Sequence, residues 1–244
     1  MSYLPTKKER FMKEFNLSFN VQSMGNDFCK RANQMIVCGL QTMNNLGTQS
    51  NKRIFSKEEY CCGSTLHRGC YQPSPVYDLI VGNAKRGKLC RSTNPRVTHH
   101  FLFDDHQRLV LVETFHRGRI SSTEYLFYEN QTVIGITIDC NGFLASVSEE
   151  RYEHGRISYY AIARCYYLES EYKCFDYHQE EFVYDELGLS KCRFINFTPQ
   201  SVYLIDEVYD FQRENGYLVA YSPETFDGCP STSPQYLIKG RRKA

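Results

Sequence analysis

The sequence predicts an α+β fold, in which a helical N-terminal segment packs on a predominantly antiparallel β-meander sheet. Three observations lead to this prediction. Aromatic residues make up 14% of the chain, with 19 Tyr and 16 Phe, and both residue types favour strands. From about residue 99 the apolar positions recur with a period of two. No helix-length pattern separates the expected strands between residues 107 and 165, which excludes parallel βαβ units there.

The clearest helix is expected over residues 27–46. Asp27 can cap its N-terminus, and Gly47 can end it. An amphipathic helix of this kind must bury its apolar face, and the sheet is the nearest surface that can cover it. The apolar positions at helical spacing are Phe28, Ala32, Met35, Ile36, Leu40 and Met43.

Shorter elements fill the rest of the first hundred residues. Two capping boxes, Thr6–Glu9 and Ser56–Glu59, predict short helices. Seven glycines and prolines are spread over residues 63–98, so we expect a loop there, interrupted by one short strand at Asp78–Val81.

Hairpin signals and alternating runs indicate the strands that follow. Asn141–Gly142 and Asn215–Gly216 are typical of tight two-residue hairpins, because both central residues of that turn need positive φ. Gly118 and Gly155 are expected to act in the same way. The expected strands are Phe101–Phe103, Leu109–Phe115, Ile120–Tyr128, Val133–Ile138, Phe143–Val147, Ile157–Ala163 and Val202–Val208.

We expect residues 1–244 to form a single domain with an uneven distribution of charge. A helical and loop portion (1–98) precedes a β portion (99–225) and a tail (226–244). The first 103 residues hold 15 Lys/Arg and 6 Asp/Glu, whereas residues 104–225 hold 10 and 21. Such asymmetry indicates a charged partner, or two portions of the chain that neutralise each other.

The chain is expected to be cytoplasmic. Its first eleven residues have no apolar core of a secretory signal, and its apolar stretches are too short to span a bilayer. The 11 Cys, an odd number without disulfide-framework spacing, are therefore expected to be reduced thiols that act as small buried hydrophobes. No membrane partner is expected.

One group of soft ligands could hold zinc. Cys61, Cys62, His67 and Cys70 lie within ten residues, and Cys90 could replace one of them. The group lacks the CxxC pair of a standard zinc finger. The favoured interpretation is a cysteine-rich loop packed on the core without a metal, and zinc is the alternative.

A second group could run acid–base or metal chemistry. On a strand, His100, Asp104 and His106 would project to one face, with His99 beside them. The same residues also fit a polar turn between two strands, which is the favoured interpretation. The chain has no nucleophile elbow, phosphate-binding loop or dinucleotide fingerprint, which disfavours an enzyme.

Carboxylates interleaved with tyrosines mark a candidate partner-binding surface. Charge would steer a basic protein to it, and aromatic rings would hold the complex. A solvated, aggregation-resistant edge with every second Tyr in the core is the favoured interpretation of the stretch by itself, and partner binding is the functional one. The predicted partner-binding residues are Glu149, Glu150, Tyr152, Glu153, Glu169, Glu171, Asp176, Glu180 and Glu181.

Two similar segments lie in the β portion. Arg117–Ser121 reads RGRIS and His154–Ser158 reads HGRIS, each with a Tyr close by. They resemble the Tyr/Gly-Arg hairpin units of YD-repeat (Rhs-type) proteins, a likeness of hairpin chemistry between residues 117 and 159. Toxins of polymorphic toxin systems often carry such repeats.

In its charge layout and its lack of catalytic motifs the chain resembles bacterial immunity proteins of polymorphic or contact-dependent toxin systems. The resemblance implies a protein-binding inhibitor without a cofactor, which covers a basic, nuclease-like toxin with its acidic Tyr-rich β surface. The alternatives are a metal-dependent hydrolase or nuclease that uses the His/Asp group near residues 99–106, and a scaffold that assembles through its hairpins. Nucleic-acid binding through the basic segments is disfavoured, because the acidic portion would repel a duplex.

Overall fold

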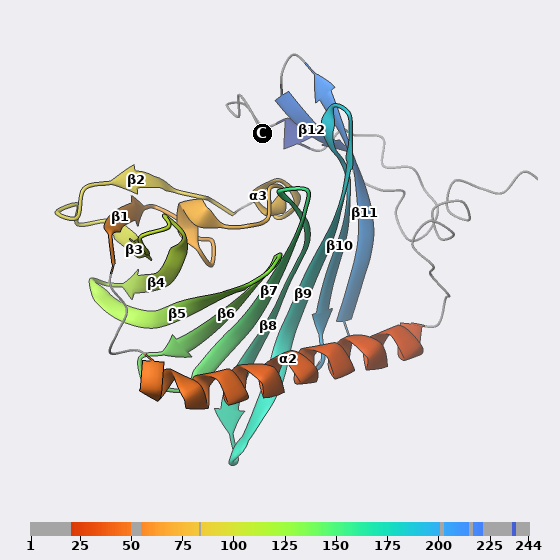
Figure 1. The fold of residues 1–244 in the computed structure, drawn as a ribbon. Coiled ribbons are helices and arrows are strands. Elements are labelled where there is room, and N and C mark those ends of the chain that lie inside the picture. The colour runs from red at the N-terminus through yellow and green to blue at the C-terminus, as the bar shows by residue number, and fades with distance from the viewer. Residues whose placement is uncertain are drawn as a thin grey trace, which may run out of the picture.

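A single curved antiparallel sheet of thirteen strands dominates the described chain (Figure 1). Each strand pairs with its neighbours in the sequence except at one edge, where the order runs β4-β3-β1-β2. The meander that was expected from the missing helix-length spacers is therefore confirmed. The computed structural model describes residues 21–49, 55–82, 84–200, 203–214, 217–221 and 236–237.

The strands lengthen toward the middle of the sheet. The first six are β1 (Lys57–Cys62), β2 (Lys88–Cys90), β3 (Val97–Phe103), β4 (Leu109–His116), β5 (Arg119–Glu129) and β6 (Thr132–Asp139). The others are β7 (Leu144–Glu153), β8 (Arg156–Leu168), β9 (Glu171–Asp185), β10 (Gly188–Thr198), β11 (Tyr203–Glu214), β12 (Tyr217–Tyr221) and β13 (Tyr236–Leu237).

One long helix, α2 (Val21–Gln49), lies across strands β6 to β9 (Figure 1). Phe28, Ala32 and Ile36 form its buried stripe and share a core with strand residues such as Ile136 and Tyr177. The helix predicted over 27–46 is confirmed, but it begins and ends beyond the expected signals. Asp27 and Gly47 lie inside the helix, because packing on the sheet outweighs these local stop signals. None of the described helices is long and apolar enough to cross a membrane.

Gly39 lets α2 approach the sheet closely. A Cβ atom added at Gly39 would lie 2.3 Å from Cγ2 of Val147, well inside van der Waals contact. The side chains of β7 alternate, so Val147 faces α2, while Ser146 and Ser148 face the other way. We call these two sides of the sheet the α2 face and the inner face.

The inner face is covered by residues 63–82 and 84–87, which we call the cover segment. It contains the 3-10 turn η2 (Gly69–Tyr71) and the short helix α3 (Tyr77–Ile80) (Figure 1). Val76 and Leu79 pack on inner-face residues of β8 to β11, and Cys70 and Tyr71 pack on β3 to β6. The cover segment is thus mostly irregular, as the predicted loop was. Its apolar side chains, however, are packed against the sheet.

Two of the predicted short elements are wrong. Ser56–Glu59 does not open a helix, because Lys57–Cys62 is strand β1 and pairs with both β2 and β3. Long-range pairing and the burial of Cys61 outweigh the local capping signal there. Asp78–Val81 is not a strand, since α3 occupies Tyr77–Ile80. The capping box at Thr6–Glu9 lies outside the described residues.

The turns show why the two similar segments look alike. Arg117 and Gly118 have φ of 51° and 75°, and His154 and Gly155 have φ of 51° and 76°. Both pairs therefore form two-residue hairpin turns, β4–β5 and β7–β8, in which both central residues have positive φ. At Asn141–Gly142 only the glycine has positive φ, at 86°, and the Asp139 carboxylate accepts backbone N–H bonds across that turn. Asn215–Gly216 lies outside the described residues.

Candidate functional site

Arg68 of the cover segment is the centre of a buried ionic network on the inner face. Its guanidinium donates to both carboxylate oxygens of Glu124 on β5, at 2.8 Å each, and to Ser148 Oγ at 2.7 Å. It also pairs with Glu150 on β7, whose other oxygen accepts from Tyr152 Oη at 2.6 Å. Burial alone would raise the pKa of Glu124, but Arg68 outweighs burial and lowers it. These bonds hold the cover segment against strands β5 and β7.

A second polar cluster lies further along the inner face. His178 on β9 contacts Glu180 Oε1 through Nε2 at 2.6 Å, and Ser74 of the cover segment donates to the other oxygen of Glu180. His178 and Glu180 are both completely buried. The cover segment is stiffened from within, because Arg86 donates to Asp78 and to the Gln72 carbonyl at 2.9 Å each. The two clusters therefore lie beneath a cover segment whose own conformation is stabilised by hydrogen bonds.

A small cavity separates these two clusters. It has a volume of about 50 Å³ and lies between the cover segment and strands β8 and β9. Its polar wall is made by His67, Gln72, Tyr160, Arg164 and His178. Neither Arg68, Tyr160 nor His178 was singled out from the sequence. Arg68 lies in a Gly/Pro-rich loop, Tyr160 in an alternating strand and His178 in a strand whose buried positions are polar, so no local signal marks a shared site.

The nine predicted partner-binding residues do not share one surface. Glu150 and Glu180 are at most 3% exposed and belong to the inner-face clusters, because strand alternation turns them toward the cover segment. Asp176 pairs with Arg164, and Tyr152 bonds to Glu150 on that same face. The prediction that Glu150 and Glu180 belong to an exposed surface is therefore wrong. A partner-binding role for the other residues stays a prediction.

The remaining predicted carboxylates fall in two places. Glu149, Glu153 and Glu181 alternate with the inner-face residues of their strands and so belong to the α2 face, where Glu149 pairs with Arg151 at 2.6 Å. Glu169 and Glu171 lie at the turn between β8 and β9. Figure 1 shows that this hairpin projects beyond α2.

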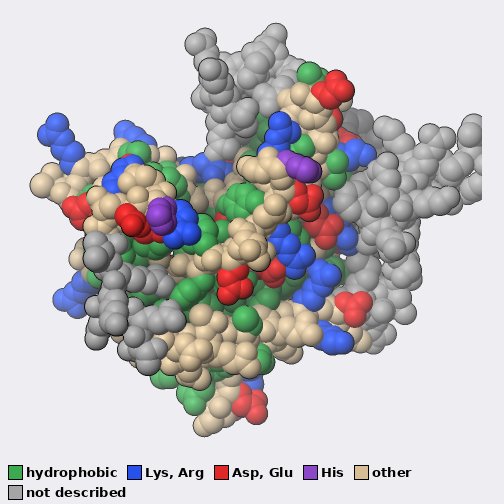
Figure 2. Space-filling model, viewed as in Figure 1, with side chains coloured by type: hydrophobic (Ala, Val, Ile, Leu, Met, Phe, Trp, Pro, Cys, Tyr) green, Lys and Arg blue, Asp and Glu red, His purple; other side chains and the backbone are tan. Residues whose placement is uncertain are grey.

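Exposed aromatic residues gather at that projecting hairpin and at the β6–β7 turn, which contains Phe143. Phe143 stacks on Tyr167 with ring centroids 5.1 Å apart, and Tyr166 stacks on Phe175 at 6.0 Å. Five of the thirteen large apolar side chains that are exposed in the described chain lie here. We define the distal patch as these five residues with the two carboxylates beside them: Phe143, Tyr166, Tyr167, Leu168, Phe175, Glu169 and Glu171. Hydrophobic and acidic side chains are both visible at this end of the molecule in Figure 2.

The four candidate zinc ligands are separated by the fold. Cys61 lies with Cys70 and His99, and the hydrogen bond with Cys70 outweighs burial and, with His99, lowers the pKa of Cys61 to about 5. Cys62 instead lies beside Cys90, and His67 contacts Thr137 Oγ1 at 3.2 Å. The residues that the structure describes contain no group of three His, Cys, Asp or Glu able to hold a metal.

The His/Asp group near residues 99–106 does not converge either. His99 is buried under the cover segment, whereas His100 faces the other side, where it stacks on Tyr60 and contacts Glu113 at 2.8 Å. The strand ends at Phe103, and Asp104 caps an exposed turn that contains His106. The turn interpretation is confirmed, because Asp104 accepts backbone N–H bonds as a turn carboxylate does.

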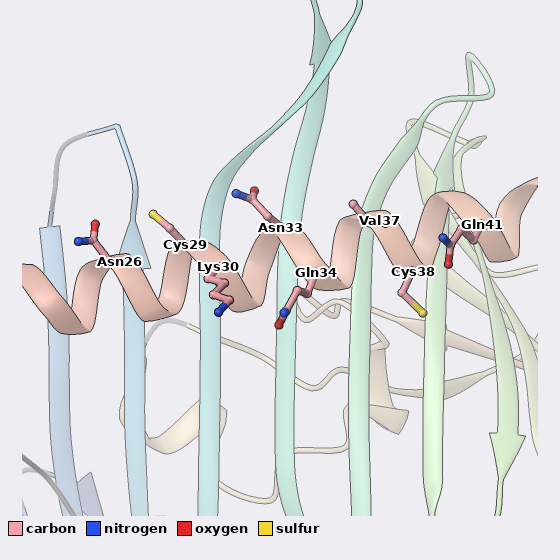
Figure 3. Close-up of a pocket in the computed structure, with 8 residues that line it drawn as sticks. All are labelled: Asn26, Cys29, Lys30, Asn33, Gln34, Val37, Cys38 and Gln41. Atoms are coloured by element: carbon pink, nitrogen blue, oxygen red, sulfur yellow. The ribbon is translucent and has the colours of Figure 1, made fainter.

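The outward side of α2 carries a broad, open groove (Figure 3). Its lining is mainly amides and two thiols, with Lys30 as its one cationic group and no carboxylate or imidazole. Amides and thiols of this kind are compatible with a solvated helix surface, so we assign no site there. The lining residues are Asn26, Cys29, Lys30, Asn33, Gln34, Val37, Cys38 and Gln41.

Comparisons with known proteins show no family for this chain. No protein-family model matches it, and no curated protein matches it. One solved structure that resembles it is a protein of unknown function from Bacteroides fragilis NCTC 9343, which is 9% identical. The match covers 45% of this chain and 86% of that chain at a TM-score of 0.31, a likeness too low to carry an argument.

Proposed function

We propose that the chain is a non-catalytic inhibitor that binds a basic polypeptide through the distal patch. The partner that we favour is a toxin domain of a bacterial toxin–immunity system, bound in the cytoplasm, as the resemblance to immunity proteins implies. One observation carries the proposal: five exposed apolar side chains lie at the projecting β8–β9 hairpin and the adjoining β6–β7 turn, with the Phe143–Tyr167 pair on one side of the hairpin and the Tyr166–Phe175 pair on the other. Apolar side chains that gather in this way on a surface mark a site of interaction.

The rings of the patch are ordered before any partner binds. Tyr167 stacks on Phe143 and also lies against Tyr172, with ring centroids 5.0 Å apart. The hydroxyl oxygen of Tyr172 in turn accepts a hydrogen bond from the backbone N–H of Leu144 at 3.3 Å. Rings that are already held lose little conformational freedom on binding, so more of the contact energy appears as affinity. Large aromatic residues are also enriched among the side chains that dominate binding.

The turn that carries the acidic groups is strained. Glu169 and Ser170 have φ of 53° and 67°, a left-handed conformation that suits glycine rather than a side chain. The corresponding turns at Arg117–Gly118 and His154–Gly155 use glycine as their second residue. Strain of this kind in a non-glycine turn supports a functional reason for its residues. Glu169 is 76% exposed and pairs with Lys173 at 3.2 Å, and Glu171 adds a second carboxylate, so the turn keeps an acidic charge that can steer a basic partner to the adjacent rings.

Site-specific photocrosslinking tests the proposal with a matched pair of leucines. Leu168 lies in the patch, and Leu187 lies in the turn at the opposite end of β9, where it is 77% exposed. Benzoylphenylalanine at position 168, in protein expressed in its own host, should crosslink one basic polypeptide, while the same label at 187 should not. The crosslinked polypeptide, once purified, should bind the wild-type chain directly and lose its activity on binding.

Affinity measurements with that purified partner complete the test. Tyr167→Ser should weaken binding roughly thirtyfold, as loss of a central aromatic contact does, whereas Leu187→Ser should leave it unchanged. Glu169→Lys with Glu171→Lys should slow association and reduce its dependence on salt. Equal crosslinking at both positions, or a crosslink to a second copy of the chain, would rule out the proposal.

A further inference from the structure

The cavity beneath the cover segment contains an unusual number of unpaired polar atoms. Four buried side-chain nitrogen or oxygen atoms of the described residues have no hydrogen-bond partner, and three of them belong to residues that line this cavity. They are Nδ1 of His67, Oη of Tyr160 and Nδ1 of His178. An unpaired buried polar group costs about 1–3 kcal/mol, so three around one cavity call for a common ligand.

Burial fixes the positions of His178 and Tyr160, and His178 also has a hydrogen-bond partner outside the cavity. His178 is fixed through its Nε2 by Glu180, and it is completely buried. Tyr160 is 1% exposed and comes from β8, in the middle of the sheet. Glu180 engages Nε2 of His178, and Nδ1 of the same ring is the atom without a partner.

His67 lines the cavity, and the partners of its Nε2, the Thr137 hydroxyl and the more distant Glu124 carboxylate at 3.7 Å, decide whether its Nδ1 carries the proton. Ser146 Oγ donates to Thr137 Oγ1 at 2.8 Å, which leaves the Thr137 hydroxyl proton free to bond to Nε2 of His67. In that arrangement the proton of the neutral imidazole resides on Nδ1, the atom without a partner. Burial lowers the pKa of His67 to about 4, so the ring is neutral at ordinary pH.

The lining of the cavity contains one cation and no carboxylate, while Glu180 and Glu124 contact His178 and His67 from outside that lining. The cation is Arg164. Asp176 engages Nη1 of Arg164, which leaves further N–H groups of a five-donor guanidinium. Burial raises the pKa of Tyr160, so its hydroxyl keeps its proton and can donate. Gln72 adds an amide to the same wall.

We propose that this cavity is a binding site for a small free carboxylate of about the size of acetate. Its volume of about 50 Å³ admits three or four groups of the size of a water molecule, which matches two oxygens and two carbons. The carboxylate oxygens accept from Tyr160, His67 and Arg164, and the methyl group lies against Ile162. The site is independent of the distal patch, which lies at the projecting end of the same strands.

A matched pair of tyrosines tests the site. Tyr160→Phe removes the buried hydroxyl beside Gln72, while Tyr159→Phe removes a hydroxyl of the adjacent residue, which faces α2 and bonds to Gln179. Acetate is titrated into the purified protein at constant ionic strength. Binding is followed by the ¹⁵N shifts of the histidine imidazoles and by thermal unfolding. Chloride and the neutral isostere acetamide are titrated in parallel.

Acetate should raise the unfolding temperature and shift the His67 ring resonances, whereas acetamide and chloride should do neither. Tyr160→Phe should weaken acetate binding about tenfold, as loss of a hydrogen bond to a charged acceptor does, and Tyr159→Phe should bind as the wild type does. If acetate acts no differently from chloride, if acetamide binds equally well, or if the two variants bind acetate equally, the carboxylate site is wrong. The imidazole shifts of the wild-type protein distinguish acetate binding from its absence even if a variant does not fold.

Discussion

Arg68 and Glu124 form a bidentate ion pair, in which Nε and Nη2 each lie 2.8 Å from a carboxylate oxygen although 56 residues separate the two in the chain. Both side chains are 3% exposed. The pair lies directly over Gly135 of β6, where an added Cβ would be 2.2 Å from Glu124 Oε1 and 2.7 Å from Arg68 Nη2. The irregular cover segment is thus fixed to the sheet by charge as well as by apolar packing.

Arg68→Met is expected to destabilise the fold by about 3–5 kcal/mol, because it leaves Glu124 and Glu150 buried without their cation. Urea unfolding measures this loss. Adding Glu124→Gln to Arg68→Met should recover part of the stability, since it removes one of the stranded charges. Arg151→Met is the control: Arg151 is 55% exposed and its pair with Glu149 should change stability by less than about 1 kcal/mol. Equal losses for both arginines would contradict the buried network.

Gly39→Ala is expected to cost about 1–3 kcal/mol, because the new methyl group would overlap Val147. Adding Val147→Ala should restore part of the loss, and the double-mutant cycle measures the coupling. Gly25→Ala serves as the control within the same helix. Its Cβ would meet the Phe197 ring at an ordinary 3.6 Å, so the better helix propensity of alanine should leave stability equal or raised by up to about 1 kcal/mol.

Stability is expected to fall as the pH drops from about 6.5 to about 4. Burial lowers the pKa of His67 from 6.5 to about 4, so over this window the unfolded chain binds a proton that the folded chain does not. The contribution is about 3 kcal/mol, present in full above the ordinary pKa of the ring and lost as the pH falls toward about 4. Glu124, whose pKa is lowered, adds a further loss at the acid end. Chemical unfolding at a series of pH values should show a flatter profile between pH 4 and 6.5 for His67→Gln.

Ser170→Gly is expected to stabilise the fold by about 1 kcal/mol, because glycine adopts the positive φ of this turn without strain. Gly155→Ala at the equivalent turn position should destabilise it by a similar amount. An added Cβ at Gly155 meets nothing within 4 Å, so backbone strain is the cause that this control isolates. If Ser170→Gly leaves the free energy of unfolding unchanged, the turn is not strained. The argument that its residues are retained for a functional reason would then fail.

The meander and the long helix could be predicted because their signals are local. Alternating runs such as Ile120–Tyr128 and the stripe from Phe28 to Met43 correspond to β5 and α2. Strands β9 and β10 were missed, since polar residues such as His178 and Glu180 occur at fully buried positions. In a sequence, a buried charged residue cannot be told from an exposed one until its partner is known. The partner of Glu180 is Ser74, which lies 106 residues away in the chain.

The same dependence on long-range contacts explains which candidate site residues could be predicted from the sequence. Glu169 and Glu171 were singled out because they are interleaved with tyrosines, and the structure places them at the turn between β8 and β9, near the exposed Leu168. Glu150 could not be told from Glu149 by sequence, although one bonds to buried Arg68 and the other to exposed Arg151. Which of two adjacent carboxylates is buried depends on strand register and on the cover segment, and both are long-range properties.

The most direct test of the proposed function is native mass spectrometry of tagged protein purified from its own host. Wild type, Leu187→Ser and the double variant Tyr167→Ser/Leu168→Ser are compared. The proposal predicts a stoichiometric complex with one basic polypeptide for the wild type and Leu187→Ser, and a bare chain for the double variant. A bare chain in all three samples, or an undiminished complex with the double variant, would contradict it.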